Sequence, residues 1–510
     1  MNVITITGDP VGLDSLRAPF RGPVTVELTS EATNNVRAGH AVITEAIANG
    51  DVVYGVNTGF GKLADRRISP DDLVELQRRV IASHMVGVGD PLPDQVVRAM
   101  MVIKLICLAR GHSGVRTEIT DLIAAMINAD VLPIVPSQGS VGASGDLAPL
   151  SHMAGAMTGL GRVRVGGNEV AAVEGLASVG LKPVVLGPKE GVALINGTQT
   201  STALALRGLF GAESVLNAGL AAGALTMEAT AGRQTALDDR IQQIRGQRGQ
   251  IQVARSLRRL VTDSEVLDVE FDGRRLQDPY SLRCMPQVMG SAWDLICFAA
   301  DVLEREANAV SDNPLMFPAD GIVLSGGNFH GQPVAFAADI VALALCEIGS
   351  LSERRTAMLM DTTMSGLAPF LVDNAGLNSG FLMAQVTSAA LVAENRARAT
   401  PSSVDSIPTS AGQEDHVSMA THGAARLAPM MRNSAYVVAI ELMSAAQGLD
   451  LRNGGVAAPA GRDTYSRVRA DSAHLDDDRV LAGEMEAVAR RILDGEYLTI
   501  GQVTFGERDE

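Results

Sequence analysis

The helical architecture of this chain is clearest in the stretch Pro333-Val-Ala-Phe-Ala-Ala-Asp-Ile-Val-Ala-Leu-Ala-Leu345. The predicted helix continues to Met360. Its apolar residues cover most of a helix circumference, and a helix that is apolar on most faces must be buried on most faces. Aromatic residues are few, with one Trp, five Tyr and eleven Phe, so such helices would pack through Ala, Gly and Leu. The sequence therefore predicts a bundle of long helices. Comparable alanine-rich stretches occupy residues 197–233, 287–309, 381–398 and 416–447.

The N-terminal part has a more mixed pattern. Its first residues alternate like a short strand, and residues 1–30 as a whole predict short extended pieces before helical spacing begins at Ser30. Residues 95–130 predict two helices broken at Gly111-His-Ser-Gly114, and residues 160–190 predict a small hairpin. The expected fold class is all-α, a long helical bundle with a smaller mixed N-terminal domain. We expect that N-terminal domain at 1–200, the bundle at 201–475 and a C-terminal segment at 476–510.

The overall charge is acidic, with 42 basic against 58 acidic residues and a formal net charge of −16. This balance argues against a nucleic-acid groove and against binding to an anionic membrane surface. The N-terminus lacks the pattern of a signal peptide, and no apolar run reaches spanning length without a polar interruption. Four widely spaced cysteines argue against disulfides and zinc. We expect a reduced, cytoplasmic protein with no nucleic-acid or membrane partner.

A glycine-rich loop, Gly139-Ser-Val-Gly-Ala-Ser-Gly-Asp-Leu-Ala-Pro-Leu-Ser-His152, has the most unusual local pattern. Its glycines recur every three residues, which allows tight turns and close approach of peptide groups. Asp146, followed by an apolar run with Pro149, predicts the cap and first turn of a helix, where anionic groups are favoured. The loop lacks the second glycine of a nucleophile elbow and the lysine of a phosphate loop. Ser144 is therefore not expected to be a hydrolase nucleophile.

Polar residues in several other segments stand out, because an apolar bundle does not bury polar groups without a reason. Gln277, Tyr280 and Arg283 are spaced by three, which predicts one side of a helical turn, and an arginine held there suits a carboxylate. Taken singly, each such residue is also explained as a cap, a surface ion pair, a loop residue or a core ring. No spacing typical of metal ligands occurs, so no metal is expected. The other residues of this kind are Tyr54, Ser83, His84, Asn196, Phe329 and Glu414.

Together these segments resemble the aromatic amino acid ammonia-lyase family, in order and spacing, over nearly the whole chain. In that family the glycine nitrogen of an Ala-Ser-Gly triplet attacks the alanine carbonyl and two waters leave, which gives 4-methylidene-imidazol-5-one. The resemblance implies that Ala143, Ser144 and Gly145 form this electrophile without an external cofactor. The matching motifs are Tyr54-Gly-Val-Asn-Thr-Gly-Phe-Gly, Ala143-Ser-Gly-Asp146, Asn196-Gly-Thr-Gln, Gln277-Asp-Pro-Tyr-Ser-Leu-Arg283, Asn328-Phe-His-Gly and Gln413-Glu-Asp-His-Val-Ser-Met419.

The resemblance further implies a fumarase/aspartase-like homotetramer whose active sites draw residues from three subunits and act on a small-molecule substrate, an amino acid. By this resemblance Tyr54 would remove the β-proton of the substrate, and Arg283 would clamp the substrate carboxylate. Asn196 would support the electrophile and the carboxylate end. The residues that would line and organise the pocket are Gln277, Phe329 and Tyr280, the last implied to be catalytic.

Substrate choice in the family depends on the ring end of the pocket. Ser83-His84 together with Glu414 is similar to the histidine-selective members, since these groups can hydrogen-bond an imidazole but not a phenyl ring. The implied reaction converts L-histidine to trans-urocanate and ammonia. Departures from the family pattern leave open an aromatic or substituted-histidine ammonia-lyase or a 2,3-aminomutase, and a non-catalytic structural or binding protein is the alternative of another class. These departures are Met85-Val86, Ile106, Met285 and Gly412.

Overall fold

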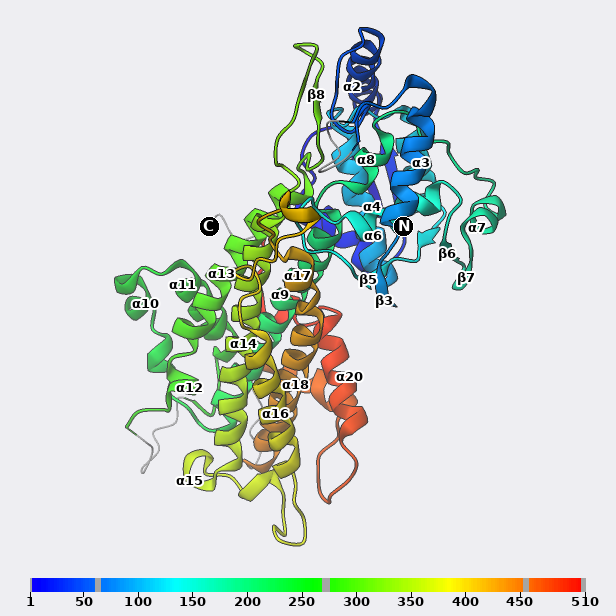
Figure 1. The fold of residues 1–510 in the computed structure, drawn as a ribbon. Helices are drawn as coiled ribbons and strands as arrows, with labels where there is room; N and C mark the ends of the chain where they lie inside the picture. The colour runs from blue at the N-terminus through cyan, green and yellow to red at the C-terminus, as the bar shows by residue number, and fades with distance from the viewer. Residues whose placement is uncertain (1, 60–65, 268–275, 453–457, 506–510) are drawn as a thin grey trace. The chain divides into compact units, whose positions relative to one another are not determined.

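The computed structural model describes residues 2–59, 66–267, 276–452 and 458–505. The chain divides into two compact units, each of which combines segments that are far apart in the sequence. Unit 1 comprises Met1–Arg207, Ala300–Asp339 and Pro401–Ala425, and unit 2 comprises Gly208–Ala299, Ile340–Thr400 and Arg426–Glu510. Helices dominate (Figure 1), which confirms the all-α class. The boundaries expected at 200 and 475 stay a prediction.

Unit 1 is built around α4 (Asp94–Ala109), which is buried from Val96 to its end. A helix buried on every face needs neighbours on every side. Those neighbours include α1 (Leu13–Arg21), α2 (Ser30–Ala48) and α5 (Thr117–Asn128). The predicted break between two helices is confirmed between α4 and α5. The other helices of unit 1 are α3 (Leu73–His84), α6 (Leu147–Met157), α7 (Ala172–Ser178), α8 (Glu190–Ile195) and α17 (Ala420–Ala425).

Helix α1 shows that the expectation of extended pieces throughout residues 1–30 is wrong in part. Leu13 and Leu16 are buried, and α1 packs against α4. Burial of this face outweighs the poor helix propensity of Pro19, which lies inside the helix. Asp14 in the first turn and Arg21 in the last turn also complement the helix dipole.

Short sheets complete unit 1. β1 (Asn2–Ile6) pairs in parallel with β2 (Val24–Leu28), which confirms the predicted N-terminal strand. β6 (Arg162–Val165) and β7 (Asn168–Ala171) form the predicted hairpin, and both of its turn glycines have positive φ. β4 (Leu132–Pro133) adds a third strand beside β6. The remaining pairs are β3 (Val88–Pro91) with β5 (Pro136–Gln138), and β8 (Leu315–Phe317) with β9 (Ile322–Leu324).

The long helices lie mostly in unit 2 (Figure 1). Four predicted helices are confirmed to within a few residues, namely α9 (Gln199–Ala229), α13 (Met285–Ala307), α14 (Gln332–Met360) and α16 (Leu382–Arg398). α9 and α14 are, among the described residues, long and apolar enough to cross a membrane, but their apolar windows are 100% and 67% buried within the protein. Burial in the bundle therefore accounts for their composition. The shorter helices of unit 2 are α10 (Asp239–Arg245), α11 (Arg248–Val261), α12 (Tyr280–Arg283), α15 (Thr362–Ser365), α19 (Pro459–Asp471), α20 (Ala482–Leu493) and α21 (Leu498–Gly501).

The fifth predicted helix, 416–447, is two helices rather than one. α17 ends at Ala425, and α18 runs from Leu427 to Leu451. Pro429 explains the break, because in a continuous helix its ring would clash with the carbonyl four residues earlier, at Ala425. In the first turn of a new helix the same proline is tolerated.

A buried ion pair links the long helices inside unit 2. Arg355 of α14 and Glu441 of α18 are both fully buried, and Arg355 Nε and Nη2 donate to the two Glu441 oxygens at 2.5 and 2.7 Å. Thr226 of α9 and Ser352 of α14 donate to the same carboxylate at 2.9 and 2.6 Å. One carboxylate thus joins three helices with its hydrogen bonds satisfied.

Candidate active site

The predicted glycine loop lies between β5 and α6 in unit 1. Gly142 and Gly145 have φ of +68° and +73°, a region that residues with side chains rarely adopt. A Cβ on Gly145 would lie 2.2 Å from the Gly197 carbonyl oxygen, so the space as well as the backbone requires glycine there. Asp146 N donates to the same oxygen at 2.7 Å. The loop is therefore tied to the turn that follows α8.

Both polar groups of Ser144 are engaged by residues predicted to act with it. Asn196 Nδ2 donates to the Ser144 carbonyl oxygen at 2.7 Å, and Ser144 Oγ donates to Glu414 Oε1 at 2.6 Å. Asn196 ends α8 and does not open α9, which begins at Gln199. Its Oδ1 is buried and has no hydrogen-bond partner among the described residues. The site therefore holds one acceptor that is available to a ligand.

Glu414 uses both of its carboxylate oxygens. While Oε1 accepts from Ser144, Oε2 accepts from Thr409 Oγ1 at 2.6 Å and from Ser410 Oγ at 2.9 Å. Partial burial raises the pKa of the Glu414 carboxyl, but these hydrogen bonds and the nearby His84 outweigh it, so the pKa lies below its ordinary value. Glu414 is therefore an oriented carboxylate that keeps its charge near neutral pH.

Asp146 precedes α6 as predicted, but its side chain does not cap that helix. The fully buried carboxylate accepts from Ser140 Oγ at 3.0 Å, from Thr421 Oγ1 at 2.6 Å, and from Ser201 N and Oγ at 2.7 and 2.9 Å. Burial raises the pKa of the Asp146 carboxyl, against the lowering effect of the hydrogen bonds. Because Ser201 and Thr421 stand near the starts of α9 and α17, three helix starts meet at this carboxylate.

His84 is the last residue of α3. Its Nδ1 lies 2.7 Å from the Val80 carbonyl oxygen, so Nδ1 is assigned the hydrogen and Nε2 is left for another partner. Ser83 Oγ donates to the same carbonyl at 3.1 Å. Ser83 Oγ also lies 3.0 Å from His84 Nδ1, so the Ser83 hydroxyl is held at the end of α3, while the nearby His84 helps to lower the pKa of Glu414.

The turn that carries Phe329 packs onto the loop. The Gly142 carbonyl oxygen accepts from Gly331 N at 3.2 Å and from Ser418 Oγ at 2.9 Å. Gly331 follows the half-buried Phe329, and Ser418 follows the Glu414 segment. Hydrogen bonds and charge interactions in unit 1 thus bring together the segments of His84, Ser144, Asn196, Phe329 and Glu414.

Tyr54 lies in a separate turn and is half-buried. Val53 N donates to Asn57 Oδ1 at 2.9 Å, and Val53 and Val56 pack into a core cluster with side chains of α2. The last two residues of the Tyr54 motif, 60 and 61, lie outside the described residues. The hydrogen bonds around Ser144 given above do not include Tyr54, so its catalytic role stays a prediction.

Gln277, Tyr280 and Arg283 belong to unit 2. Tyr280 and Arg283 share the single turn of α12, as their spacing predicts, whereas Gln277 precedes the helix. The Arg283 guanidinium carbon lies 4.6 Å from the centre of the Tyr280 ring, an attractive cation–π geometry. Arg283 Nε is buried and has no hydrogen-bond partner among the described residues. This arginine therefore has a donor available for an anion.

Most of the positions that depart from the family pattern have a packing or backbone explanation, but Val86 is 64% exposed and has none. Met85 lies against α6, since a Cβ on Gly155 would meet the Met85 sulfur at 2.4 Å. Ile106 is buried in α4, and Met285 is fully buried in unit 2. Gly412 has φ of +81°, which favours glycine at that turn. None of these observations requires a change of substrate.

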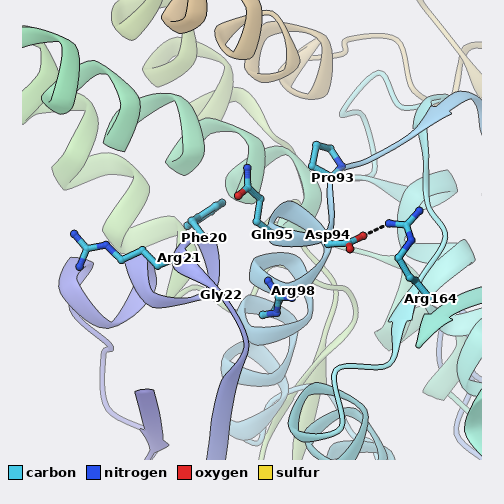
Figure 2. Close-up of a pocket in the computed structure, with 8 residues that line it drawn as sticks. All are labelled: Phe20, Arg21, Gly22, Pro93, Asp94, Gln95, Arg98 and Arg164. Atoms are coloured by element: carbon cyan, nitrogen blue, oxygen red, sulfur yellow. Dashed lines mark hydrogen bonds and ion pairs between the residues drawn. The ribbon is translucent and has the colours of Figure 1, made fainter. Parts of the chain in front are cut away.

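A separate pocket of about 430 Å³ lies where the end of α1, the start of α4 and β6 meet (Figure 2). Two of its arginines are paired with carboxylates, Arg164 with Asp94, and Arg98 with Asp130 at 2.9 Å. None of the residues predicted to carry chemistry lines this pocket. It is therefore distinct from the candidate active site.

Sequence reasoning missed the buried supports of the site. The Asp146 carboxylate is expected from its context to cap a helix, whereas it binds Ser140 of its own loop and two distant segments, at Ser201 and Thr421. Lys104, which contacts the Asn196 turn, is not singled out at all. Its signal is a lone charge in the apolar run Met100-Met-Val-Ile-Lys-Leu-Ile-Cys-Leu-Ala109, because a charge in a fully buried helix needs polar partners.

Comparison with known proteins agrees with this geometry. The family profile for aromatic amino acid lyase matches residues 11–470. The chain is 54% identical over 478 residues to a histidine ammonia-lyase of Paracidovorax citrulli (strain AAC00-1), covering 94% of this chain and 93% of that protein. A histidine ammonia-lyase structure from Trypanosoma cruzi matches with a TM-score of 0.91 at 37% identity, covering 98% and 95% of the two chains. A tyrosine aminomutase from Streptomyces globisporus matches with a TM-score of 0.93 at 34% identity, covering 98% of each chain.

Proposed function

Because the chain belongs to the aromatic amino acid lyase family, we propose that it is a cytoplasmic enzyme that deaminates L-histidine to trans-urocanate and ammonia. The β-proton of an amino acid is weakly acidic and ammonia is a poor leaving group, so the reaction needs both an electrophile and a base. The observation that supports the proposal is the arrangement at Ser144, with Asn196 on its carbonyl and Glu414 on its hydroxyl.

We infer that Ala143, Ser144 and Gly145 form 4-methylidene-imidazol-5-one, with no external cofactor. Closure joins Gly145 N to the Ala143 carbonyl carbon, and two waters leave, one with the alanine oxygen and one with the serine hydroxyl. The residues present fit this group. Gly145 has the positive φ of a tight turn, Asn196 binds the Ser144 carbonyl oxygen, and Glu414 accepts from the hydroxyl that must leave. When formed, the group supplies an electrophile for the substrate amino group.

Glu414 can serve closure and substrate recognition in turn. Its Oε1 is occupied by Ser144 Oγ before closure, and departure of that hydroxyl as water removes the donor. Oε2 stays bound to Thr409 and Ser410, so the carboxylate keeps its orientation. Oε1 then accepts the N–H of a substrate imidazole, a donor that a phenyl ring lacks. His84 acts at the same end, with Nε2 left for the substrate ring.

The remaining roles follow from the chemistry of each side chain. We propose that Tyr54 removes the β-proton and that Arg283 binds the substrate carboxylate through paired hydrogen bonds. Asn196 Oδ1, buried without a partner among the described residues, accepts a hydrogen from the substrate. Because large apolar side chains are exposed on the long helices of unit 2, as a surface for association would require, we propose a homotetramer whose active sites are shared between subunits. The residues that organise the pocket from that part of the chain are Gln277, Tyr280 and Arg283, with Phe329 supplied from unit 1.

A substrate panel tests this function. Purified protein is given L-histidine, L-phenylalanine or L-tyrosine, and the products are followed by ultraviolet absorbance and mass. We expect urocanate from L-histidine, with kcat/KM at least about tenfold higher than for the other two, because only imidazole pairs with Glu414. Ser144→Ala is the inactive control, since it lacks the hydroxyl that closure must lose. Cinnamate or coumarate in place of urocanate contradicts the histidine assignment.

The second candidate is a 2,3-aminomutase, which the likeness to the tyrosine aminomutase structure favours. Such an enzyme moves the amino group from the α-carbon to the β-carbon, so a β-amino acid accumulates and little ammonia is released. Chromatography of the amino acid fraction with an ammonia assay separates the two. Equal amounts of ammonia and urocanate identify the lyase.

A further inference from the structure

A buried lysine lies behind the turn that carries Asn196. Lys104 is in α4, its side chain is fully buried, and Nζ donates to the carbonyl oxygens of Ala193 at 3.0 Å and of Asn196 at 2.8 Å. We propose that Lys104 is a positioning residue that holds the Asn196 amide on the Ser144 carbonyl. This inference rests on the proposed function of that turn.

The Lys104 ammonium group has no carboxylate in direct contact among the described residues, although Asp312 and Asp146 act on it from nearby. The residues on either side of it in α4 are buried and apolar, and burying an ammonium group without a carboxylate is strongly unfavourable. Burial accordingly lowers the pKa of Lys104. Among the described residues Lys104 forms no ion pair, and the nearby Asp312 is bound by Lys189 at 2.5 Å. The groups that Nζ satisfies are the two carbonyls at the end of α8.

Those carbonyls belong to the turn on which the glycine loop depends. A helix end leaves carbonyl groups without partners, and α8 ends at Ile195 after only six residues. Asn196 then has ψ of 137° and Gly197 has φ of +123°. From this turn Asn196 Nδ2 donates to Ser144 O, and Gly197 O accepts from Asp146 N, both at 2.7 Å. Lys104 thus fixes one side of a turn whose other side binds the loop.

The Asn196 amide is a donor aimed at a carbonyl that becomes part of the electrophile. A donor held at about 2.7–3.1 Å from such an oxygen withdraws electron density from it, and this effect depends steeply on position. Loss of the Lys104 bonds would let the turn relax. A displacement of about 1 Å in a catalytic arrangement can lower the rate about 10²-fold.

The test compares Lys104→Met, which keeps the side-chain length and removes the donors, with Lys182→Met at an exposed lysine. Intact mass gives the fraction of chains that have lost two waters, and steady-state kinetics gives kcat and KM for L-histidine. We expect Lys104→Met to lower the dehydrated fraction, and to lower kcat per dehydrated site about tenfold or more with KM changed less than about twofold. Lys182→Met should match the wild type.

A double variant identifies the route of the effect. Because Lys104 acts through Asn196, adding Lys104→Met to Asn196→Ala should cause little further loss of dehydration or kcat. Additive losses would overturn the proposal. So would a folded Lys104→Met protein with wild-type dehydration and kcat and only a lower unfolding midpoint, since Lys104 would then be merely structural.

Lys104→Gln is made in parallel in case Lys104→Met does not fold. The glutamine side chain keeps a polar amide at this position but is too short to reach both carbonyls. The proposal therefore again predicts a lower dehydrated fraction and a lower kcat, and wild-type values of both would overturn it. The mass measurement needs no substrate. A wild-type chain that loses two waters but makes no urocanate contradicts the histidine assignment, while the Lys104 comparison still decides this inference. A wild-type chain that keeps both waters overturns the proposed function and this inference together.

Discussion

The Glu414 carboxylate is bound at one oxygen by Ser144 and at the other by Thr409 and Ser410. Glu414→Gln removes the charge that we assign to imidazole binding. A hydrogen bond to a charged group contributes about 1.5–3 kcal/mol, so kcat/KM for L-histidine should fall about ten- to hundredfold. The control is Asp415→Asn, at the exposed neighbour, which should leave kcat/KM unchanged. Equal losses in both variants would contradict the role of Glu414.

The lowered pKa of Glu414 also predicts a pH dependence of stability. Its hydrogen bonds with Thr409 and Ser410, which remain when the Ser144 hydroxyl leaves, stabilise the charged form in the folded state, so the carboxylate contributes stability at neutral pH that is lost as pH falls through its lowered pKa. Urea unfolding should show a wild-type advantage over Glu414→Gln that shrinks below about pH 4, near the ordinary glutamate value. An advantage that grows on acidification would reverse the sign and contradict the account.

Individual candidate residues can be proposed from the sequence where contiguous motifs carry them. Ala143, Ser144 and Gly145 stand in one loop, and their identity needs no fold. The bonds among site residues were not predictable, because Asp146 and Thr421 are 275 residues apart and Lys104 and Asn196 are 92 apart. Only the folded chain brings such pairs into contact.

At the scale of helices, the buried Arg355–Glu441 pair joins α14 and α18. Arg355→Met leaves an uncompensated buried carboxylate, so the free energy of unfolding should fall by about 3–5 kcal/mol. Arg398→Met, at an exposed arginine whose partner Glu394 is exposed as well, should cost less than about 1 kcal/mol. The double variant Arg355→Met/Glu441→Leu should recover most of the loss, because no charge is then left unpaired. Chemical denaturation checks all three, and a double variant no better than Arg355→Met would contradict this explanation.

Long apolar helices were the most predictable elements, because their pattern repeats over many turns. Breaks within helices and short helices were less predictable. α1 forms although it contains Pro19, since its face packs on α4. The split between α17 and α18 follows from Pro429, which the apolar pattern around it conceals. In each case the effect of a proline on the helix depends on tertiary packing, which cannot be read from the sequence.

At the scale of the whole molecule, large apolar side chains are exposed on helices of unit 2. Phe298, Leu343 and Met383 are 53%, 46% and 61% exposed on α13, α14 and α16, and such surfaces in a bundle favour association. We expect light scattering to give the mass of four chains. Met383→Glu should shift the protein toward smaller species, whereas Val480→Glu, at a residue 85% exposed outside the long helices, should not.

Shared active sites predict complementation between inactive variants. Tyr54→Phe lacks the proposed base, and Arg283→Lys lacks the paired donors for the substrate carboxylate. If the two residues reach a site from different subunits, co-expression should restore up to about a quarter of wild-type activity by random assembly. Co-expression of Tyr54→Phe with the Tyr54→Phe/Arg283→Lys double variant is the control without rescue. No restoration in mixed oligomers would contradict shared sites.

The central claim is that Ala143, Ser144 and Gly145 become the electrophile on which histidine deamination depends. The most direct measurement is the intact mass of the purified chain beside that of Ser144→Ala, with urocanate formation assayed on the same samples. The account predicts that the wild-type chain is lighter than its sequence mass by two waters and is active on L-histidine. It predicts that the Ser144→Ala chain keeps its full sequence mass and makes no urocanate. An unmodified wild-type mass, or urocanate formed at the wild-type rate by Ser144→Ala, would contradict it.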